Sequence, residues 1–292
     1  MTAEHADADV IEQGPGGPRW VGLVGLAALV AVSLIGVLNG RETSRPAPVA
    51  TPKSVRNAIS VTPNAVYPEA DGAGGFRTSR VTFPHGARAE LVYPARLNLA
   101  SMGVRPSVGG TVDGEFRSLT APLYGEAETA AGRPMLRHLA PNVTLWPGPP
   151  GVRTAGPVLL FAFGDWRLAL QDERAGMAFE QRKAWAGNLR GTVTADGFLT
   201  LSGGGPLRLS RPGEVRDGVL VGPQLWLGGL SPRMLVVAPI PGCERPPRTR
   251  VVLDTRHPIV ASTCRDGFYL AAAGDEDFVR RVLRDVRVRA TG

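Results

Sequence analysis

The chain contains two cysteines, Cys243 and Cys264, and both stand next to turn residues in its last quarter. Pro-Gly precedes the first, and Arg-Asp-Gly follows the second. A disulfide between them closes a loop of about 20 residues and stabilises the fold by up to about 3 kcal/mol. The alternative is a nucleophilic cysteine with His257 as its base, supported only by nearness in sequence. Cys243, His257 and Cys264 match no recognised zinc spacing. We therefore predict a disulfide and no metal site.

Other catalytic signatures are missing from the sequence. There is no HExxH helix, no GxSxG elbow, no phosphate-binding loop and no dinucleotide fingerprint. The glycine-rich run 202–206 lacks a following lysine and helix, so we interpret it as a loop. The histidines stand singly, which is typical of turn and surface positions: His5, His85, His138 and His257. We expect no cofactor.

Three carboxylates, Asp165, Asp172 and Glu173, form the nearest acidic cluster. A pair of carboxyl groups at a set separation is what glycoside hydrolysis needs. Their flanks resemble hairpin turns, which favours a structural role. An enzyme is therefore the weaker interpretation, and a hydrolase remains an alternative.

Four tryptophans in the C-terminal part are possible ligand contacts. Exposed indoles stack on sugar rings or line a partner surface, whereas buried indoles belong to the core. The sequence alone leaves both roles open for each of them: Trp146, Trp166, Trp185 and Trp226.

The composition is that of a globular, basic protein. The chain has 43% hydrophobic and 20% charged residues, a net charge of +7, and arginine as its dominant cation. The arginines are scattered along the chain, which argues against a dedicated anion-binding surface. We expect no nucleic-acid partner. A basic outer domain would favour anionic lipid heads or cell-wall polymers.

Short strands separated by turns dominate the region after residue 66. Runs at 81–83 and 89–93, at 158–163 and 166–170, and at 192–194 and 198–201 predict hairpins, the last joined by Asp196-Gly197. Further strands are predicted at 115–119, 142–146, 219–221, 225–227, 234–238, 250–254, 259–263 and 268–272. The fold class is therefore mainly β, an antiparallel sandwich or barrel-like sheets. The run 110–116 resembles 191–198, which hints at two related β units.

The last element is a helix. Phe278, Val279, Val282, Leu283 and Val286 form an apolar stripe at helical spacing. Acidic residues 275–277 precede the stripe and two arginines stand near its end, as the helix dipole favours. We predict a C-terminal helix that covers one face of a sheet.

The N-terminal region indicates a membrane anchor. Residues 20–38 contain no charged residue and a single serine, Ser33, and 19 residues nearly suffice to cross a bilayer as a helix. We divide the chain into an acidic tail at 1–19, a transmembrane helix at 20–38, a Pro-rich linker at 39–66 and a β-rich domain at 67–292. A division of that domain into two β units near residue 150 stays open.

Orientation is contested by the sequence. Arg19 stands before the predicted helix, whereas Arg41, Arg45, Lys53 and Arg56 follow it, which favours a cytoplasmic C-terminal side. Long domains cross the membrane largely regardless of charge, and a cysteine pair favours an oxidising compartment. We expect an extracytoplasmic β domain.

Together these patterns predict a single-pass membrane-anchored envelope protein with a non-enzymatic, β-rich interaction domain. Its expected partners are the membrane, in which it is integral, and a protein or cell-envelope molecule. The alternatives are an anchored hydrolase acting on envelope glycans or peptides, and an accessory subunit of a membrane complex.

Overall fold

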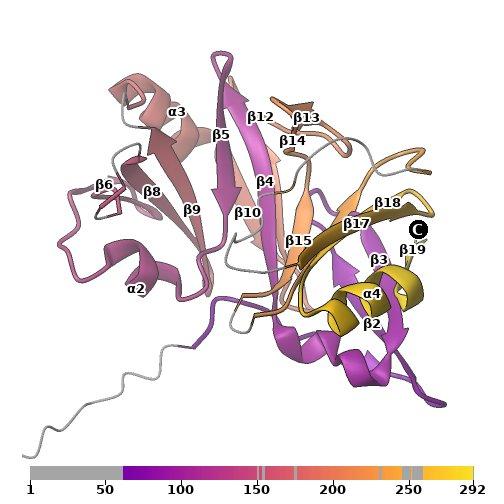
Figure 1. The fold of residues 1–292 in the computed structure, drawn as a ribbon. Coiled ribbons are helices and arrows are strands. Elements are labelled where there is room, and N and C mark those ends of the chain that lie inside the picture. The colour runs from indigo at the N-terminus through magenta and orange to yellow at the C-terminus, as the bar shows by residue number, and fades with distance from the viewer. Residues whose placement is uncertain are drawn as a thin grey trace, which may run out of the picture. The chain divides into compact units, whose positions relative to one another are not determined.

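The computed structural model describes residues 62–149, 151–152, 155–173, 176–229, 232–244, 251 and 259–291 (Figure 1). The chain is mainly β and has a C-terminal helix, as predicted. The predicted acidic tail, transmembrane helix and most of the linker lie outside the described residues. None of the helices in the described ranges has the length and apolar character needed to cross a membrane.

A central sheet of eleven strands carries the domain. Neighbouring strands in the described part of this sheet are antiparallel. Its path runs β17-β18-β16-β15-β4-β5-β9-β8-β7-β6, with β12 also paired to β4. β17 and β6 end the path, so the sheet is open and not a closed barrel among the described residues. The strands are β4 (Val104–Val112), β5 (Glu115–Thr120), β6 (Arg137–Ala140), β7 (Val143–Trp146), β8 (Ala155–Phe163), β9 (Trp166–Glu173), β12 (Arg208–Leu209), β15 (Gln224–Gly228), β16 (Met234–Pro239), β17 (Ile259–Arg265) and β18 (Phe268–Gly274).

Smaller sheets and helices surround the central sheet. A four-stranded sheet has the order β1-β2-β3-β19. Two hairpins, β10-β11 and β13-β14, form separate two-stranded sheets. The strands are β1 (Ala70–Asp71), β2 (Phe76–Thr82), β3 (Arg88–Pro94), β10 (Leu189–Val193), β11 (Leu199–Gly203), β13 (Val215–Arg216), β14 (Val219–Leu220) and β19 (Arg287–Thr291). The helices are η1 (Ala95–Leu97), η2 (Leu99–Met102), α2 (Gly125–Ala130), α3 (Phe179–Asn188) and α4 (Glu276–Asp285).

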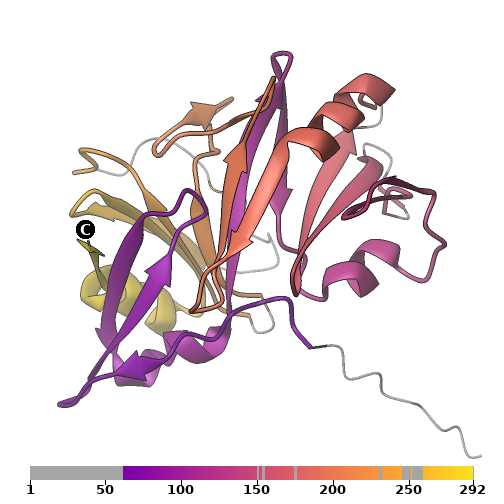
Figure 2. The same cartoon turned by 180° about the vertical axis from the view of Figure 1, so that it is seen from behind.

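Two apolar cores lie on the same side of the long strand β4. Val104 belongs to the first core, and Val108 and Val112, an even number of residues further on, belong to the second. The first core lies between β15, β16 and β18 and the covering elements β2, β3, β19 and α4. The second lies between β5, β7, β8 and β9 and the covering elements α3, β10 and β11. Figure 2 shows the two covering hairpins from behind, β2-β3 in indigo and β10-β11 in orange.

The two halves of the central sheet repeat one topology. Outward from the β4–β15 pair, the order is β4-β5-β9-β8 on one side and β15-β16-β18-β17 on the other. Each outer hairpin is followed by a ten-residue helix and then a strand, α3 and β10 in one half and α4 and β19 in the other. The strands that cover the cores are exchanged between the halves. β10 follows the outer hairpin of the first half but pairs with β11, which comes next in the chain and leads into the second half. β19 follows the outer hairpin of the second half but pairs with β3, which precedes β4 of the first half.

This repeat differs from the two divisions considered from the sequence. The echo of 110–116 in 191–198 compares the β4-β5 hairpin with β10-β11, which occupy different places in the repeat. Strands on both sides of residue 150 pair within one sheet, β7 with β8. The halves instead meet where β4 pairs with β15.

The predicted C-terminal helix is present and is capped at both ends. The Asp275 carboxylate accepts a hydrogen bond from the Phe278 amide at 2.8 Å. That bond, followed by one from Arg233, lowers the pKa of Asp275. At the other end, Arg265 donates to the carbonyl oxygens of Leu283 and Val286, where a cation is favoured.

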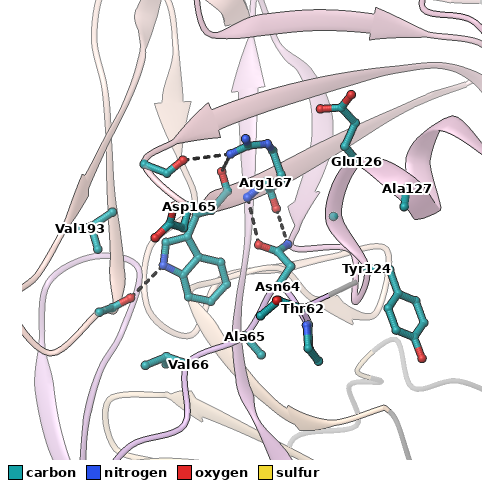
Figure 3. A pocket seen from close by; sticks show the side chains of 15 residues that line it. Thr62, Asn64, Ala65, Val66, Tyr124, Glu126, Ala127, Asp165, Arg167 and Val193 are labelled. Carbon is teal, nitrogen blue, oxygen red and sulfur yellow. Dashed lines mark hydrogen bonds between the residues drawn. The ribbon is translucent and has the colours of Figure 1, made fainter. Parts of the chain in front are cut away.

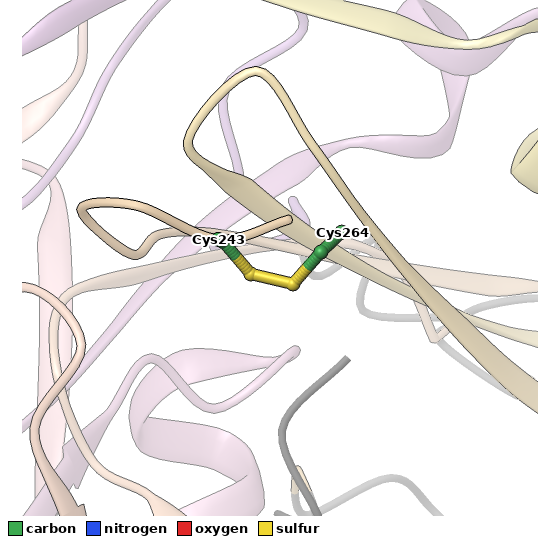
Figure 4. Close-up of a disulfide and its surroundings, with 2 residues drawn as sticks. All are labelled: Cys243 and Cys264. Atoms are coloured by element: carbon green, nitrogen blue, oxygen red, sulfur yellow. A yellow bond between two sulfur atoms is a disulfide. The ribbon is translucent and has the colours of Figure 1, made fainter. Parts of the chain in front are cut away.

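The predicted disulfide joins Cys243 to Cys264 (Figure 4). Both half-cystines are buried in a third apolar cluster, on the opposite side of β16 and β18 from the first core. Neither cysteine is a free thiol, which removes the nucleophile considered with His257. His257 itself lies outside the described residues.

Replacing both cysteines by alanine should lower the free energy of unfolding by about 3 kcal/mol, because the bond closes a loop with a sequence separation of 21. Urea unfolding of the full chain in detergent measures this. Reductant should destabilise the wild type by a similar amount and leave the double variant unchanged. A wild type insensitive to reductant would contradict a stabilising disulfide.

Candidate functional site

A pocket of about 960 Å³ opens beside the point where the described chain enters the domain (Figure 3). Four short segments line it: residues 62–66, residues 124–127 at the start of α2, residues 164–167 at the β8–β9 turn, and Val193 with Gly197 of the β10-β11 hairpin. The volume is within the range of pockets that bind small molecules or peptide side chains. We call it the Asn64 pocket.

Asn64 holds two strand ends apart at this pocket. Its side-chain Nδ2 donates to the carbonyl oxygens of Pro122 and Arg167, both at 2.7 Å, and its Oδ1 accepts from the Arg167 amide at 3.0 Å. Its own backbone amide donates to the Leu123 carbonyl at 2.8 Å. A carboxamide offers the same donor and acceptor as a peptide group, so Asn64 takes the place of a neighbouring strand.

The second half of the sheet has no such gap. There β16 and β18 pair from Met234 to Pro239 without interruption, whereas the equivalent strands β5 and β9 pair only at Leu119 and Thr120. Beyond Thr120 the chain of β5 leaves β9, and Asn64 occupies the space between them. The Asn64 pocket therefore lies where the two halves of the fold differ.

Trp166 forms a rigid wall of the pocket. Its ring is 6% exposed and belongs to the second core, and its Nε1 donates to the Gly197 carbonyl at 2.8 Å. Gly197 has a φ of 83°, the left-handed conformation expected for the Asp196-Gly197 turn. A Cβ at Gly197 would also meet Val66 at 3.2 Å, so glycine lets the hairpin approach the wall.

The rim of the pocket combines apolar and acidic groups. Tyr124 and Val193 are 43% and 40% exposed there, and Glu126 and Asp165 are exposed carboxylates. Arg167 turns its guanidinium to the carbonyl oxygens of Gly164 and Trp166, at 2.9 and 3.0 Å. The rim therefore suits a ligand with an apolar group next to a positive charge.

The other three candidate tryptophans lie away from this pocket. Trp185 is fully buried in the second core, so its ring reaches no ligand. Trp146 is 7% exposed within a small apolar cluster with Val158 and Leu160. Trp226 is half-buried on β15 and donates to Gln224 Oε1 at 3.0 Å.

The acidic cluster considered for glycoside hydrolysis does not form. Asp172 has no exposed side-chain surface, and its carboxylate accepts hydrogen bonds from Arg117, Arg182 and the amides of Glu173 and Met177. Asp165 lies in the turn before β9 and Asp172 near the far end of that strand, seven residues on, which is on the order of 23 Å at the rise of a strand. The catalytic pair of a glycosidase is separated by less than about 10 Å. Asp172 instead joins β5, β9 and α3.

The remaining candidate groups do not converge. His85 and His138 are exposed on separate hairpins, and His5 lies outside the described residues. No three metal-ligating side chains gather in the part of the chain that the structure describes.

Sequence reasoning missed both Asn64 and Tyr124. Asn64 stands in the Pro-rich run at 39–66 that the sequence assigned to a linker. No known protein family, curated protein or solved structure matches this chain.

Replacing Asn64 by alanine should lower the free energy of unfolding by about 1–3 kcal/mol, because three hydrogen bonds at the ends of β5 and β9 are lost. Urea unfolding measures the change, and hydrogen exchange at the Arg167 amide should speed up. The matched control is Asn142→Ala, which loses one hydrogen bond of 3.4 Å. Equal effects of the two substitutions would contradict the role given to Asn64.

Proposed function

We propose that this chain is a single-pass membrane protein of the cell envelope, whose extracytoplasmic β domain binds a protein partner in the Asn64 pocket without catalysing a reaction. The partner is a segment that places an apolar side chain against Tyr124, Val193 and Trp166, with a lysine or arginine next to it. The two halves of this proposal, the compartment and the site, have separate support.

The compartment is supported by the apolar run at 20–38 and by the disulfide. A 19-residue run without charge is close to the length needed to cross a membrane. Disulfides persist in oxidising compartments and are rare in the cytosol, and Cys243 is bonded to Cys264. The Lys/Arg count around the run argues for the opposite orientation, which makes topology the first thing to measure.

The single observation that carries the binding role is the pocket of about 960 Å³ beside Asn64, at the place where β5 and β9 separate. The second half of the same fold closes the equivalent place with strand pairing, so the fold itself does not require an opening there. Exposed aromatic and aliphatic side chains at the opening, Tyr124 and Val193, are what protein interfaces use at their centre. Glu126 and Asp165 would select for a cationic neighbour.

A topology assay tests the compartment. A reporter active only outside the cytoplasm, fused after Gly292, should give a signal, while a cytoplasm-only reporter at the same place should be silent. The expected result follows from the disulfide, which requires an oxidising environment. The opposite pattern would contradict the proposed location and leave both cysteines reduced.

Site-specific crosslinking in the native cell tests the binding role. A photoreactive residue at Tyr124 should give one discrete protein adduct, because this side chain is exposed on the rim. Charge reversal of the rim by Glu126→Arg with Asp165→Arg should abolish that adduct. The matched control reverses the exposed Glu276 on α4 and should leave it intact.

A second position provides the negative control. A photoreactive residue at Val260, 54% exposed on the edge strand β17, should not give the same adduct. Labelling of the same protein from Val260, or an adduct at Tyr124 that survives charge reversal of the rim, would contradict binding in the Asn64 pocket.

A further inference from the structure

A second crevice lies on the face of the central sheet opposite the two cores. One row of cross-strand neighbours crosses it, from Gln224 on β15 to Ser107 on β4 and Thr120 on β5. Ser118 precedes Thr120 by two residues on β5 and therefore points to the same face. These residues, with Trp226 and the 219–221 segment of the β13-β14 hairpin, line a crevice of about 90 Å³. It shares no lining residue with the Asn64 pocket.

Three hydroxyl groups in this crevice are unused. The side chains of Ser107, Ser118 and Thr120 make no hydrogen bond to any part of the chain that the structure describes. Ser107 is buried at the floor of the crevice, Thr120 is half-buried and Ser118 is exposed, so the set runs from the sheet to the solvent. Hydroxyl groups both donate and accept, so three of them facing one crevice without a partner in the described part of the fold are available to a ligand in place of water.

The tryptophan beside the hydroxyl groups is held in a fixed orientation. Trp226 Nε1 donates to Gln224 Oε1 at 3.0 Å, and Gln224 Nε2 donates to the Leu220 carbonyl at 2.6 Å. Gln224 is buried, so this chain of two hydrogen bonds ties the indole to the hairpin above the crevice. A half-buried indole with its N–H already satisfied offers an apolar plate to a ligand.

The other half of the fold carries apolar side chains at the positions that match these hydroxyl groups. Ser118 and Thr120 flank the core residue Leu119 on β5, and Met234 and Val236 flank the equivalent core residue Leu235 on β16. Both Met234 and Val236 are buried in the apolar cluster around the disulfide. The same backbone position thus accepts large apolar side chains, yet the first half carries hydroxyl groups there.

The chemistry of the lining selects the class of ligand. None of the described residues that line the crevice is charged, which favours a neutral ligand. Hydroxyl side chains donate and accept hydrogen bonds and so complement other hydroxyl groups. The volume holds roughly six to nine water-sized groups, which is the edge of a ring and not a whole oligomer. An indole plate beside these groups suits the C–H face of a sugar ring.

We infer that this crevice binds one pyranose residue of a neutral sugar, with the ring against Trp226 and its hydroxyl groups on Ser107, Ser118 and Thr120. This inference goes beyond the proposed protein partner and uses different residues. It assigns the domain a second contact, with a glycan.

Titration with simple glycosides tests the inference. The full chain is kept in lauryldimethylamine oxide, because detergents with sugar head groups would compete. Methyl glycosides of glucose, mannose, galactose and N-acetylglucosamine are the probes, and the indole N–H resonance of Trp226, assigned from its loss in Trp226→Phe, is the readout. At least one glycoside should shift this resonance saturably, with a Kd on the order of 1 mM, typical of a weak single-residue site.

Isosteric variants decide whether the hydroxyl groups do the binding. Thr120→Val and Ser107→Ala keep the shape of the crevice and should each raise the Kd by about tenfold or more. The matched control is Thr78→Val, the same change at a half-buried position on β2, which should bind as the wild type. Absence of saturable binding for all four glycosides, or wild-type affinity in Thr120→Val, would overturn the inference.

Discussion

The antiparallel pairing of β4 with β15 is the contact on which the rest of the domain depends. It joins two halves of the same topology into one sheet, through the register that places Ser107 opposite Gln224 and Val104 opposite Leu227. Because β4 is long enough to continue past β15, its inward side chains serve both cores, Val104 in one and Val108 in the other. Neither half could bury its apolar face on the strands of that half alone, since each core also uses a covering strand from the other half.

Both proposed sites lie where the two halves differ. Asn64 stands between β5 and β9, where the second half has continuous pairing, and hydroxyl groups stand where the second half has Met234 and Val236. A repeated fold provides its own comparison, because any feature that one half lacks is not required by the shared backbone. The disulfide is a feature of the second half alone, where Cys243 and Cys264 lie in the apolar cluster with Met234 and Val236.

Local patterns in the sequence predicted the elements whose causes are local. The Asp-Gly turn at 196–197 and the capped apolar stripe of α4 identified their hairpin and helix, because turn chemistry and helical spacing are contained in short segments. Helix α3 was not predicted, because only Trp185 and Ala186 of its ten residues are buried and the helix therefore has no apolar stripe. Strand β4 was hidden by Pro106 and Gly109-Gly110, and the role of Asn64 depends on partners 58 and 103 residues away. Contacts between residues so far apart in the chain cannot be predicted from local patterns in one sequence.

The exchanged covering strands bear on how the domain is made. β3, near its beginning, pairs with β19, its last strand, through residues 88–92 and 287–291. Nearly two hundred residues must therefore leave the ribosome, and the translocation channel if the domain is exported, before β3 finds this partner. Until then the apolar side chains of β3, such as Leu91 and Tyr93, lack Val288 and Val286 beside them. Pairing over such a distance in sequence is slow to nucleate. The apolar face of β3 therefore lacks its cover until the residues of β19 have been synthesised.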